Sequence, residues 1–377
     1  MAGLYIHVPF CARRCLYCDF FSNTDMSYRK SYTDVLSAEM ELRREYLNGE
    51  PVETVYFGGG TPSLLNAEEL ERIFDAINTC FDLSLCREVT LEANPDDISS
   101  AYLRALRSLP FNRISMGIQS FDREDLLFLN RRHGREQAFR AVNLCKEQEY
   151  GNLSIDLIYG LPGQTTSKWK KNLEEALRLD IPHISAYHLI YEEETALYRL
   201  LEENAVKPLE EEESLTLFSL LIDTLAEAGY LHYEISNFAR PGYVSQHNSA
   251  YWSGKKYLGL GPSAHSYNGH SRDWNISSLS RYIQAIRNGT PDMEHESLTV
   301  SMKYNDYIIT RLRTSEGIDL RQIGLLFGAD YQTYCRKESL PFLNDGLLAA
   351  DGECFYLTRR GIFLSDTVMR ALIKLPS

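Results

Sequence analysis

Near its amino terminus the chain reads His7-Val8-Pro9-Phe10-Cys11-Ala12-Arg13-Arg14-Cys15-Leu16-Tyr17-Cys18, in which three cysteines have the spacing CxxxCxxC. The next cysteine, Cys80, lies far along the chain. A 4Fe-4S cluster that only carries electrons takes four cysteine thiolates. We therefore predict that Cys11, Cys15 and Cys18 hold a 4Fe-4S cluster in which one iron lacks a protein ligand and is open to chemistry.

A structural zinc site is the alternative for this loop, because zinc accepts three cysteines and one histidine and His7 would close the tetrahedron. Zinc ligands are usually divided between two turns, so a single loop favours the iron–sulfur interpretation. Disulfides are disfavoured, because the first residues carry no basic segment, long apolar stretch or cleavage site of a secretory signal. We therefore expect a reducing compartment, the cytoplasm.

Length and charge exclude several classes of protein. The 377 residues contain no apolar stretch long enough to cross a bilayer, so we expect no membrane span. A net charge of -13 disfavours extended contact with polyanions, so we expect no nucleic-acid partner.

The first half of the chain alternates short apolar runs with amphipathic stretches, the pattern of successive βα units. The apolar runs predict parallel strands at 4–8, 54–57, 89–93, 113–117, 154–158 and 184–189. The amphipathic stretches predict helices at about 28–47, 67–80, 99–108, 135–147 and 168–178.

The chemically distinctive residues follow the ends of these strands. They are Cys11 after the first strand, the turn Gly58-Gly59-Gly60-Thr61-Pro62 after the second, Glu92 to Pro95 after the third, Gln119 after the fourth, and Gly160 to Gly163 after the fifth. In barrel proteins the carboxyl ends of the strands carry the active site. We therefore predict an α/β fold, an incomplete (β/α)6 TIM-like barrel with one active mouth.

From about Tyr304 the pattern changes to compact helices followed by two short strands, which predicts a winged-helix-like α+β domain. Basic and acidic residues are equally numerous there, so the basic footprint of a DNA-binding domain is missing. We expect a partial barrel over 1–235, a connecting segment over 236–303 and the winged-helix-like domain over 304–377.

Four motifs together resemble the oxygen-independent coproporphyrinogen III oxidase superfamily of radical S-adenosylmethionine (SAM) proteins. They are Tyr5 to Cys11, Tyr56 to Pro62, Gly117 to Phe121 and Asp156 to Gly163. The resemblance implies that SAM binds the open iron through its methionyl amine and carboxylate. It further implies a SAM pocket formed by Tyr5, Gly59, Gly60, Thr61, Glu92, Gln119, Arg131 and Asp156, with Tyr17 beside the cluster.

Two residues of this pattern need comment. Arg132 is adjacent to Arg131, so the sequence leaves open which of these two arginines belongs to the SAM pocket. Glu194 stands where the family pattern has a glycine. If the family uses a positive φ there, we expect the loop to be rearranged, and we carry over no ligand contact from it.

Within this superfamily two functions compete. The oxidases continue the motif as CxxxCxxCxC, whereas this chain has Phe20 at the position of the fourth cysteine. In this respect the chain resembles the HemW-type haem chaperones, which are thought to lack the decarboxylation activity. Oxidative decarboxylation of coproporphyrinogen III in porphyrin biosynthesis is the alternative function.

The stretch His247-Asn248-Ser249-Ala250-Tyr251-Trp252 resembles the HNxxYW haem-binding signature of these chaperones. Neutral imidazole can ligate haem iron, and Tyr251 and Trp252 offer flat apolar surface for the macrocycle. His265 and His270 are competing ligands. The resemblance implies the cofactors 4Fe-4S cluster, SAM and haem. It also implies haem-accepting proteins as partners, including acceptors at the membrane, and it is compatible with a homodimer.

Overall fold

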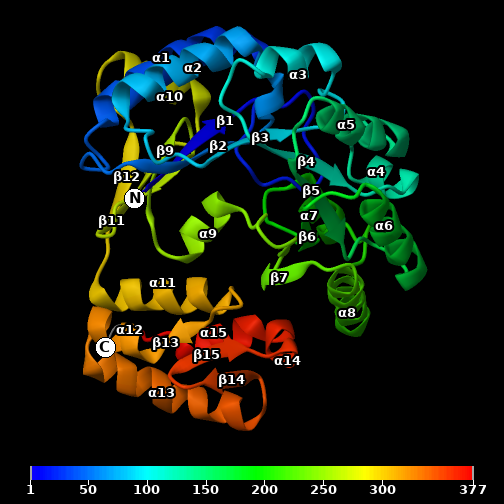
Figure 1. Ribbon diagram of the computed structural model, residues 1–377, viewed down its shortest axis with the longest axis vertical. Coiled ribbons are helices and arrows are strands. Elements are labelled where there is room, and N and C mark those ends of the chain that lie inside the picture. The colour runs from blue at the N-terminus through cyan, green and yellow to red at the C-terminus, as the bar shows by residue number, and fades with distance from the viewer. Residues whose placement is uncertain (1, 376–377) are drawn as a thin grey trace.

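The computed structural model describes residues 2–375, and it confirms the α/β class (Figure 1). Within these residues one sheet has twelve strands in the order β12-β11-β10-β9-β1-β2-β3-β4-β5-β6-β8-β7. Its parallel centre consists of β9 Lys256–Leu260, β1 Ala2–Val8, β2 Val52–Gly59, β3 Glu88–Ala93, β4 Arg113–Gln119, β5 Asn152–Tyr159 and β6 His183–His188. The antiparallel edges are β10 His265–Tyr267, β11 Ser271–Asn275 and β12 Met293–Ser297 on one side, and β7 Leu231–Glu234 and β8 Asn237–Ala239 on the other.

The six parallel strands predicted from the apolar runs correspond to β1 through β6. Residues 236–303, which we expected to connect two domains, contribute β8 to β12 to the same sheet. Strand β9 pairs in parallel with β1, from Ala2 opposite Lys256 to Ile6 opposite Leu260. The strand that carries the cysteine loop at its end is therefore in the middle of the sheet, with a neighbour on each side.

Helices cover the outer face of this sheet (Figure 1). They are α1 Arg29–Arg43, α2 Ala67–Cys80, α3 Ser100–Leu106, α4 Arg123–Phe128, α5 Arg135–Glu147, α6 Thr166–Arg178, α8 Glu211–Glu227 and α10 Leu279–Arg287. Two short helices lie at the mouth instead: α7 Ala196–Glu202 packs near the cysteine loop, and α9 Gln246–Trp252 faces the carboxyl-terminal part. Helix α2 begins where predicted because Asn66 and Glu69 form a capping box, in which each side chain accepts the other's backbone N–H. The short helix α4 was not predicted from the sequence.

The barrel has one continuous apolar core between the strands and helices α1, α2, α5 and α6. Phe57, Phe74 and Phe111 form an aromatic cluster within it, with ring centroids 5.1 to 5.3 Å apart. A smaller cluster that includes Leu129, Ile158 and Leu161 packs against Leu16 and Tyr17 of the cysteine loop. The cysteine loop is thereby supported by this smaller cluster near the end of β5.

The carboxyl-terminal part has its own core and a three-stranded sheet in the order β13-β15-β14. Its elements are α11 Val300–Leu312, β13 Ile318–Asp319, α12 Leu320–Phe327, α13 Ala329–Asn344, β14 Leu348–Asp351, β15 Cys354–Leu357, α14 Arg359–Phe363 and α15 Ser365–Leu372. This order of helices and strands is that of a winged helix. Figure 1 shows the domain across from α9, with α11 facing the barrel. Among residues 2–375 no helix is both long and apolar enough to span a membrane.

Candidate cofactor-binding site

The cysteine loop follows β1 and is held by backbone hydrogen bonds at several points. The amide of Cys11 donates to the carbonyl of Asn23 over 3.0 Å, and the amide of Leu16 donates to the carbonyl of Leu129 over 3.3 Å. The sulfur of Cys11 lies 3.5 Å from Thr61 Oγ1, and the sulfur of Cys15 lies 3.2 Å from Arg131 Nη1. The structure therefore brings the loop together with the predicted glycine-rich turn and with Arg131.

The donor set of this loop suits a cluster better than zinc. Both ring nitrogens of His7 are engaged, Nε2 with the carbonyl of Phe21 at 2.9 Å and Nδ1 with the hydroxyl of Tyr5 at 3.2 Å. Burial raises the pKa of Cys11 and raises that of Cys18 to about 12, so coordination to a metal is what would hold these thiols as thiolates.

Two acidic residues at the strand ends are partly buried carboxylates that fit a cationic or hydroxyl-bearing ligand. Glu92, on β3, accepts a 2.6 Å hydrogen bond from the hydroxyl of Tyr56, and burial raises its pKa to about 7. Asp156, on β5, also has a raised pKa, about 6, because of burial. An ammonium group or a ribose hydroxyl would stabilise their ionised forms.

Gln119 ends β4 in a left-handed conformation, with a φ of 68°. The pairing of β4 with β5 shifts register between Gly117 and Gln119, and a Cβ at Gly117 would lie 2.9 Å from the amide nitrogen of Gln119. Non-glycine residues adopt positive φ at a cost of about 1 kcal/mol, and such conformations cluster at functional sites. The bulge places the side-chain amide of Gln119 over Gly117, where a larger residue would collide with it.

The structure distinguishes Arg131 from its neighbour Arg132. The guanidinium of Arg131 donates to Asn94 Oδ1 and to the carbonyl of Gly117, both over 2.5 Å, in addition to the sulfur of Cys15. Arg132 instead pairs with Asp96 and Asp97. Arg131 is thus the arginine beside the cysteine loop, and its buried Nε atom has no hydrogen-bond partner among residues 2–375.

The glycine-rich turn packs closely against β1. Gly59 has a φ of 103°, and a Cβ there would lie 2.6 Å from the ring of His7. A Cβ at Gly60 would lie 2.6 Å from the carbonyl oxygen of Phe10, at the entry to the cysteine loop. These glycines therefore set the spacing between the turn and the loop, and Thr61 follows them with its hydroxyl toward Cys11.

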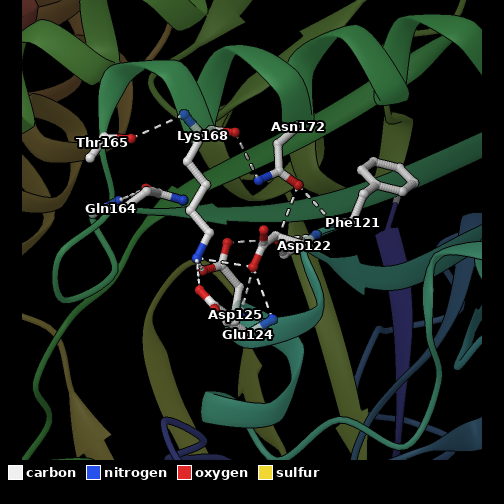
Figure 2. Close-up of polar contacts among 10 residues, drawn as sticks. Phe121, Asp122, Glu124, Asp125, Gln164, Thr165, Lys168 and Asn172 are labelled. Carbon is white, nitrogen blue, oxygen red and sulfur yellow. Dashed lines mark hydrogen bonds and ion pairs between the residues drawn. The ribbon is translucent and has the colours of Figure 1, made fainter.

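A polar network connects the segment after Gln119 to helix α6 (Figure 2). Asn172 Oδ1 accepts from the amide of Phe121 over 2.6 Å, and it lies 3.0 Å from the hydroxyl of Ser120. Lys168 Nζ lies 2.9 Å from a carboxylate oxygen of Asp122 and 2.8 Å from one of Asp125, as Figure 2 shows. This network fixes the chain where it leaves the Gln119 bulge.

The HNxxYW segment forms helix α9, and a carboxylate from β3 fixes where the helix begins. Glu88 accepts from the backbone amides of Gln246 and His247, over 3.0 and 2.9 Å. A carboxylate at a helix amino terminus satisfies otherwise unpaired N–H groups. Short though it is, α9 is thus held against the barrel sheet.

The His247 side chain is almost fully buried and has both ring nitrogens hydrogen-bonded. Nδ1 lies 2.8 Å from Thr54 Oγ1, and Nε2 lies 2.9 Å from the hydroxyl of Tyr251. Burial lowers the pKa of His247 to about 3, which keeps the imidazole neutral. Ligation of haem iron by His247 would require one of these two hydrogen bonds to break.

The aromatic helix adjoins the expected SAM pocket. The imidazole of His247 stacks on Tyr56, whose hydroxyl donates to Glu92. Trp252 lies under the guanidinium of Arg313 from the carboxyl-terminal domain, with Nε1 buried and without a hydrogen-bond partner in the described residues. Glu234 on β7 pairs with the same arginine over 3.3 Å.

A cavity of about 1520 Å³ opens between the barrel mouth and the carboxyl-terminal domain. It is larger than the ~300–1,000 Å³ of common ligand sites. Its wall includes Tyr5, Gly59 and Glu92 of the expected SAM pocket together with His247, Tyr251 and Trp252. The wall does not include the other predicted residues, Tyr17, Gly60, Thr61, Gln119, Arg131 and Asp156. Tyr17, within the cysteine loop, packs against the smaller apolar cluster.

Several positioning residues were not identified from the sequence. Thr54, Tyr56, Glu88 and Arg313 each hold a predicted site residue, as described above. Only Tyr56 carried a signal in the sequence, because it stands in the same motif as the glycine-rich turn, two residues before Gly58. The loop at Glu194 also differs from expectation: Glu194 has a φ of 69°, so it adopts the left-handed conformation itself.

Comparisons with known proteins agree with this geometry. Residues 5–176 match the radical SAM superfamily and residues 299–364 match the HemN C-terminal domain. The chain is 34% identical over 376 residues to the heme chaperone HemW of Mycobacterium tuberculosis (strain ATCC 25618 / H37Rv), covering 98% of this chain and 94% of the relative. It is 32% identical over 384 residues to HemW of Bacillus subtilis (strain 168), covering 99% of each. Among solved structures, the radical SAM enzyme coproporphyrinogen III oxidase (HemN) from Escherichia coli matches with a TM-score of 0.85 at 26% identity, covering 99% of this chain and 90% of that one.

Proposed function

Because the chain belongs to the HemW family of radical SAM proteins, we propose that it is a haem chaperone that transfers haem to acceptor proteins. The observation that carries the proposal is the shared cavity. Tyr5, Gly59 and Glu92 of the expected SAM pocket line one continuous space with the aromatic HNxxYW helix. Relatives of similar length named as haem chaperones support the assignment.

In this proposal Cys11, Cys15 and Cys18 hold a 4Fe-4S cluster, and the thiolates leave one iron for SAM. When bound, the cluster supplies an electron to the sulfonium. Glu92 and Asp156 accept hydrogen bonds from the ammonium or ribose groups of SAM. Arg131 holds a carboxylate and also the sulfur of Cys15, so it orients ligand and loop together.

The haem site in this proposal is the part of the cavity lined by α9. Tyr251 and Trp252 offer apolar ring faces to a flat macrocycle. The buried, unpartnered Nε1 of Trp252 provides a donor for a polar group of the ligand. Neutral histidine is the expected type of ligand for the haem iron.

Oxygen-independent coproporphyrinogen III oxidase is the second candidate. The structural match to HemN covers 99% of this chain, so the fold alone is compatible with both functions. Phe20 stands where the oxidases carry the fourth motif cysteine, and it is 58% exposed on the cavity wall. An apolar side chain at this position favours the chaperone.

The proposal places the protein in the cytoplasm, with haem-accepting proteins as partners, among them acceptors at the membrane, and it allows a homodimer. Transfer of haem from the loaded protein to membrane and soluble acceptors tests the partners. Light scattering at several protein concentrations tests the dimer.

The decisive experiment assays both functions on one anaerobically reconstituted preparation. Haemin is titrated against the protein, and coproporphyrinogen III turnover is measured in parallel. Stoichiometric haem binding without turnover is the expected result. Efficient turnover to protoporphyrinogen without haem binding would replace the proposal with the second candidate.

A further inference from the structure

Two of the three motif cysteines are joined by a continuous chain of side-chain contacts. The sulfur of Cys15 accepts from Arg131 Nη1 over 3.2 Å, and Arg131 Nη2 donates to Asn94 Oδ1 over 2.5 Å. Asn94 Nδ2 donates in turn to Thr61 Oγ1 over 3.2 Å, and Thr61 Oγ1 lies 3.5 Å from the sulfur of Cys11. Asn94 directly follows β3 and is the central member of this chain, although it is absent from the SAM pocket that the resemblance implies.

The side-chain amide of Asn94 can take only one orientation in this chain. A guanidinium donates hydrogen bonds and accepts none, so the amide oxygen faces Arg131 and the amide nitrogen faces Thr61. Because Thr61 Oγ1 accepts from Asn94, its own proton is free to be donated to the sulfur of Cys11. The backbone amide of Asn94 donates to Ser63 Oγ over 3.3 Å, which holds the residue in place at the strand end.

Asn94 also leaves the charge of Arg131 uncompensated. The acceptors of this guanidinium are the side-chain oxygen of Asn94, the carbonyl of Gly117 and the sulfur of Cys15. Among residues 2–375 no carboxylate lies within ion-pair distance of it, and the acids that follow Asn94 pair with Arg132 instead. A neutral amide therefore orients the guanidinium without neutralising it, and the positive charge stays directed at the cysteine sulfur.

We propose that Asn94 is a positioning residue that raises the reduction potential of the expected 4Fe-4S cluster. The potential of such a cluster depends on its charge environment and on hydrogen bonds to its sulfurs, and both donors and positive charge stabilise the reduced, more negative form. Asn94 orients one group at each of two ligands, the guanidinium of Arg131 at Cys15 and the hydroxyl of Thr61 at Cys11. The inference rests on the proposed function for the cluster itself and adds how the chain makes that cluster easier to reduce.

The test measures the midpoint potential of the cluster in the full-length, anaerobically reconstituted protein without SAM. Electron paramagnetic resonance of the reduced cluster is followed during a stepwise reductive titration. Asn94→Asp has nearly the same shape, but its carboxylate would neutralise Arg131 and could not donate an N–H to Thr61. It should lower the potential by about 59 mV or more, which corresponds to a tenfold change in a one-electron equilibrium. Asn94→Ala retains the guanidinium charge and should lower the potential by less.

A matched variant and a second measurement separate this role from general effects. Asn288→Asp adds the same charge at an exposed position at the end of α10 and should leave the potential unchanged. Iron content should stay at about four per chain in both Asn94 variants, as expected for a 4Fe-4S cluster. A merely structural role of Asn94 would lower iron content or stability without shifting the potential of the clusters that assemble.

An unchanged potential in Asn94→Asp, or an equal decrease in Asn288→Asp, would overturn the proposal. Failure of both Asn94 variants to assemble the cluster that the wild type assembles would overturn it as well, because Asn94 would then serve only to hold the loop. A wild type that assembles no cluster would instead refute the proposed function on which the inference depends.

Discussion

A guanidinium nitrogen of Arg131 donates to the sulfur of Cys15 over 3.2 Å. The same side chain reaches Asn94 after β3 and the carbonyl of Gly117 in β4. The arginine therefore ties the cysteine loop to two strands of the barrel. A single side chain links the expected cluster to the strand ends where SAM is expected to bind.

Replacing Arg131 should weaken SAM binding more than replacing its neighbour. We expect Arg131→Met to raise the Kd for SAM about tenfold or more, because a charge-assisted contact contributes about 1.5–3 kcal/mol. Arg132→Met is the matched control, since Arg132 pairs with Asp96 and Asp97 instead. Equilibrium binding to the reconstituted protein measures both. Equal affinities in the two variants would contradict the role of Arg131.

The cysteine triplet should determine iron content. We expect about four irons per chain in the wild type, the number in a 4Fe-4S cluster, and loss of the brown chromophore in Cys11→Ala. Cys80→Ala is the control, because Cys80 lies on α2, away from the loop, and contacts Glu41. Iron analysis and the visible absorption spectrum provide the measurement. A Cys11→Ala protein that keeps its iron and colour would remove the cluster from this loop.

Glu92 should destabilise the ligand-free fold at neutral and higher pH. Its pKa is about 7 in the folded protein, above the ordinary value of 4.5, so between these values the folded state binds more protons than the unfolded state. The contribution of Glu92 to stability is therefore present below pH 4.5 and is lost as the pH rises through 7.

Glu92→Gln removes this dependence, because glutamine does not ionise. Without SAM, we expect the variant to be more stable than the wild type at pH 8 by about 2 kcal/mol, a value discounted for partial solvent exposure, and equally stable near pH 4. Urea unfolding at the two pH values measures the difference, and Glu68→Gln at an exposed position of α2 is the control. The same stability difference at both pH values would refute the assignment of the shifted pKa to Glu92.

Asn172→Ala should destabilise the protein through the network of Figure 2. The substitution leaves the buried amide of Phe121 without its acceptor, which costs about 1–3 kcal/mol. Lys171→Ala, on the exposed side of α6, should change stability by about 0.5 kcal/mol or less. Chemical denaturation of both variants is the measurement. No difference between them would show that the network does not contribute to stability.

The sequence was most informative where structure is local. Hydrophobic periodicity identified β1 to β6, and helical spacing gave approximate bounds for α2 and α5 that agree with the structure. It did not identify β9 as the neighbour of β1, because the two strands are about 250 residues apart and their pairing depends on the whole sheet. The short α4 was missed because six residues carry too little periodicity.

The sequence could not decide which of two adjacent arginines lies beside the cysteine loop. Arg131 and Arg132 have the same chemistry, and only the turn after α4 directs the first toward Cys15 and the second toward Asp96. The same holds for the histidines: a motif singled out His247, whereas the fold gives its ring two hydrogen-bond partners and leaves His265 exposed to the cavity.

By itself, the sequence determined the number and spacing of the motif cysteines, the βα succession and the family resemblance. These depend on residues close together in the chain, where covalent geometry and side-chain periodicity dominate. Only the tertiary structure decided which side chains are buried, which nitrogens are already hydrogen-bonded, and that the barrel mouth and the carboxyl-terminal domain share a cavity. Burial and hydrogen bonding arise from contacts between distant segments, and local spacing does not specify them.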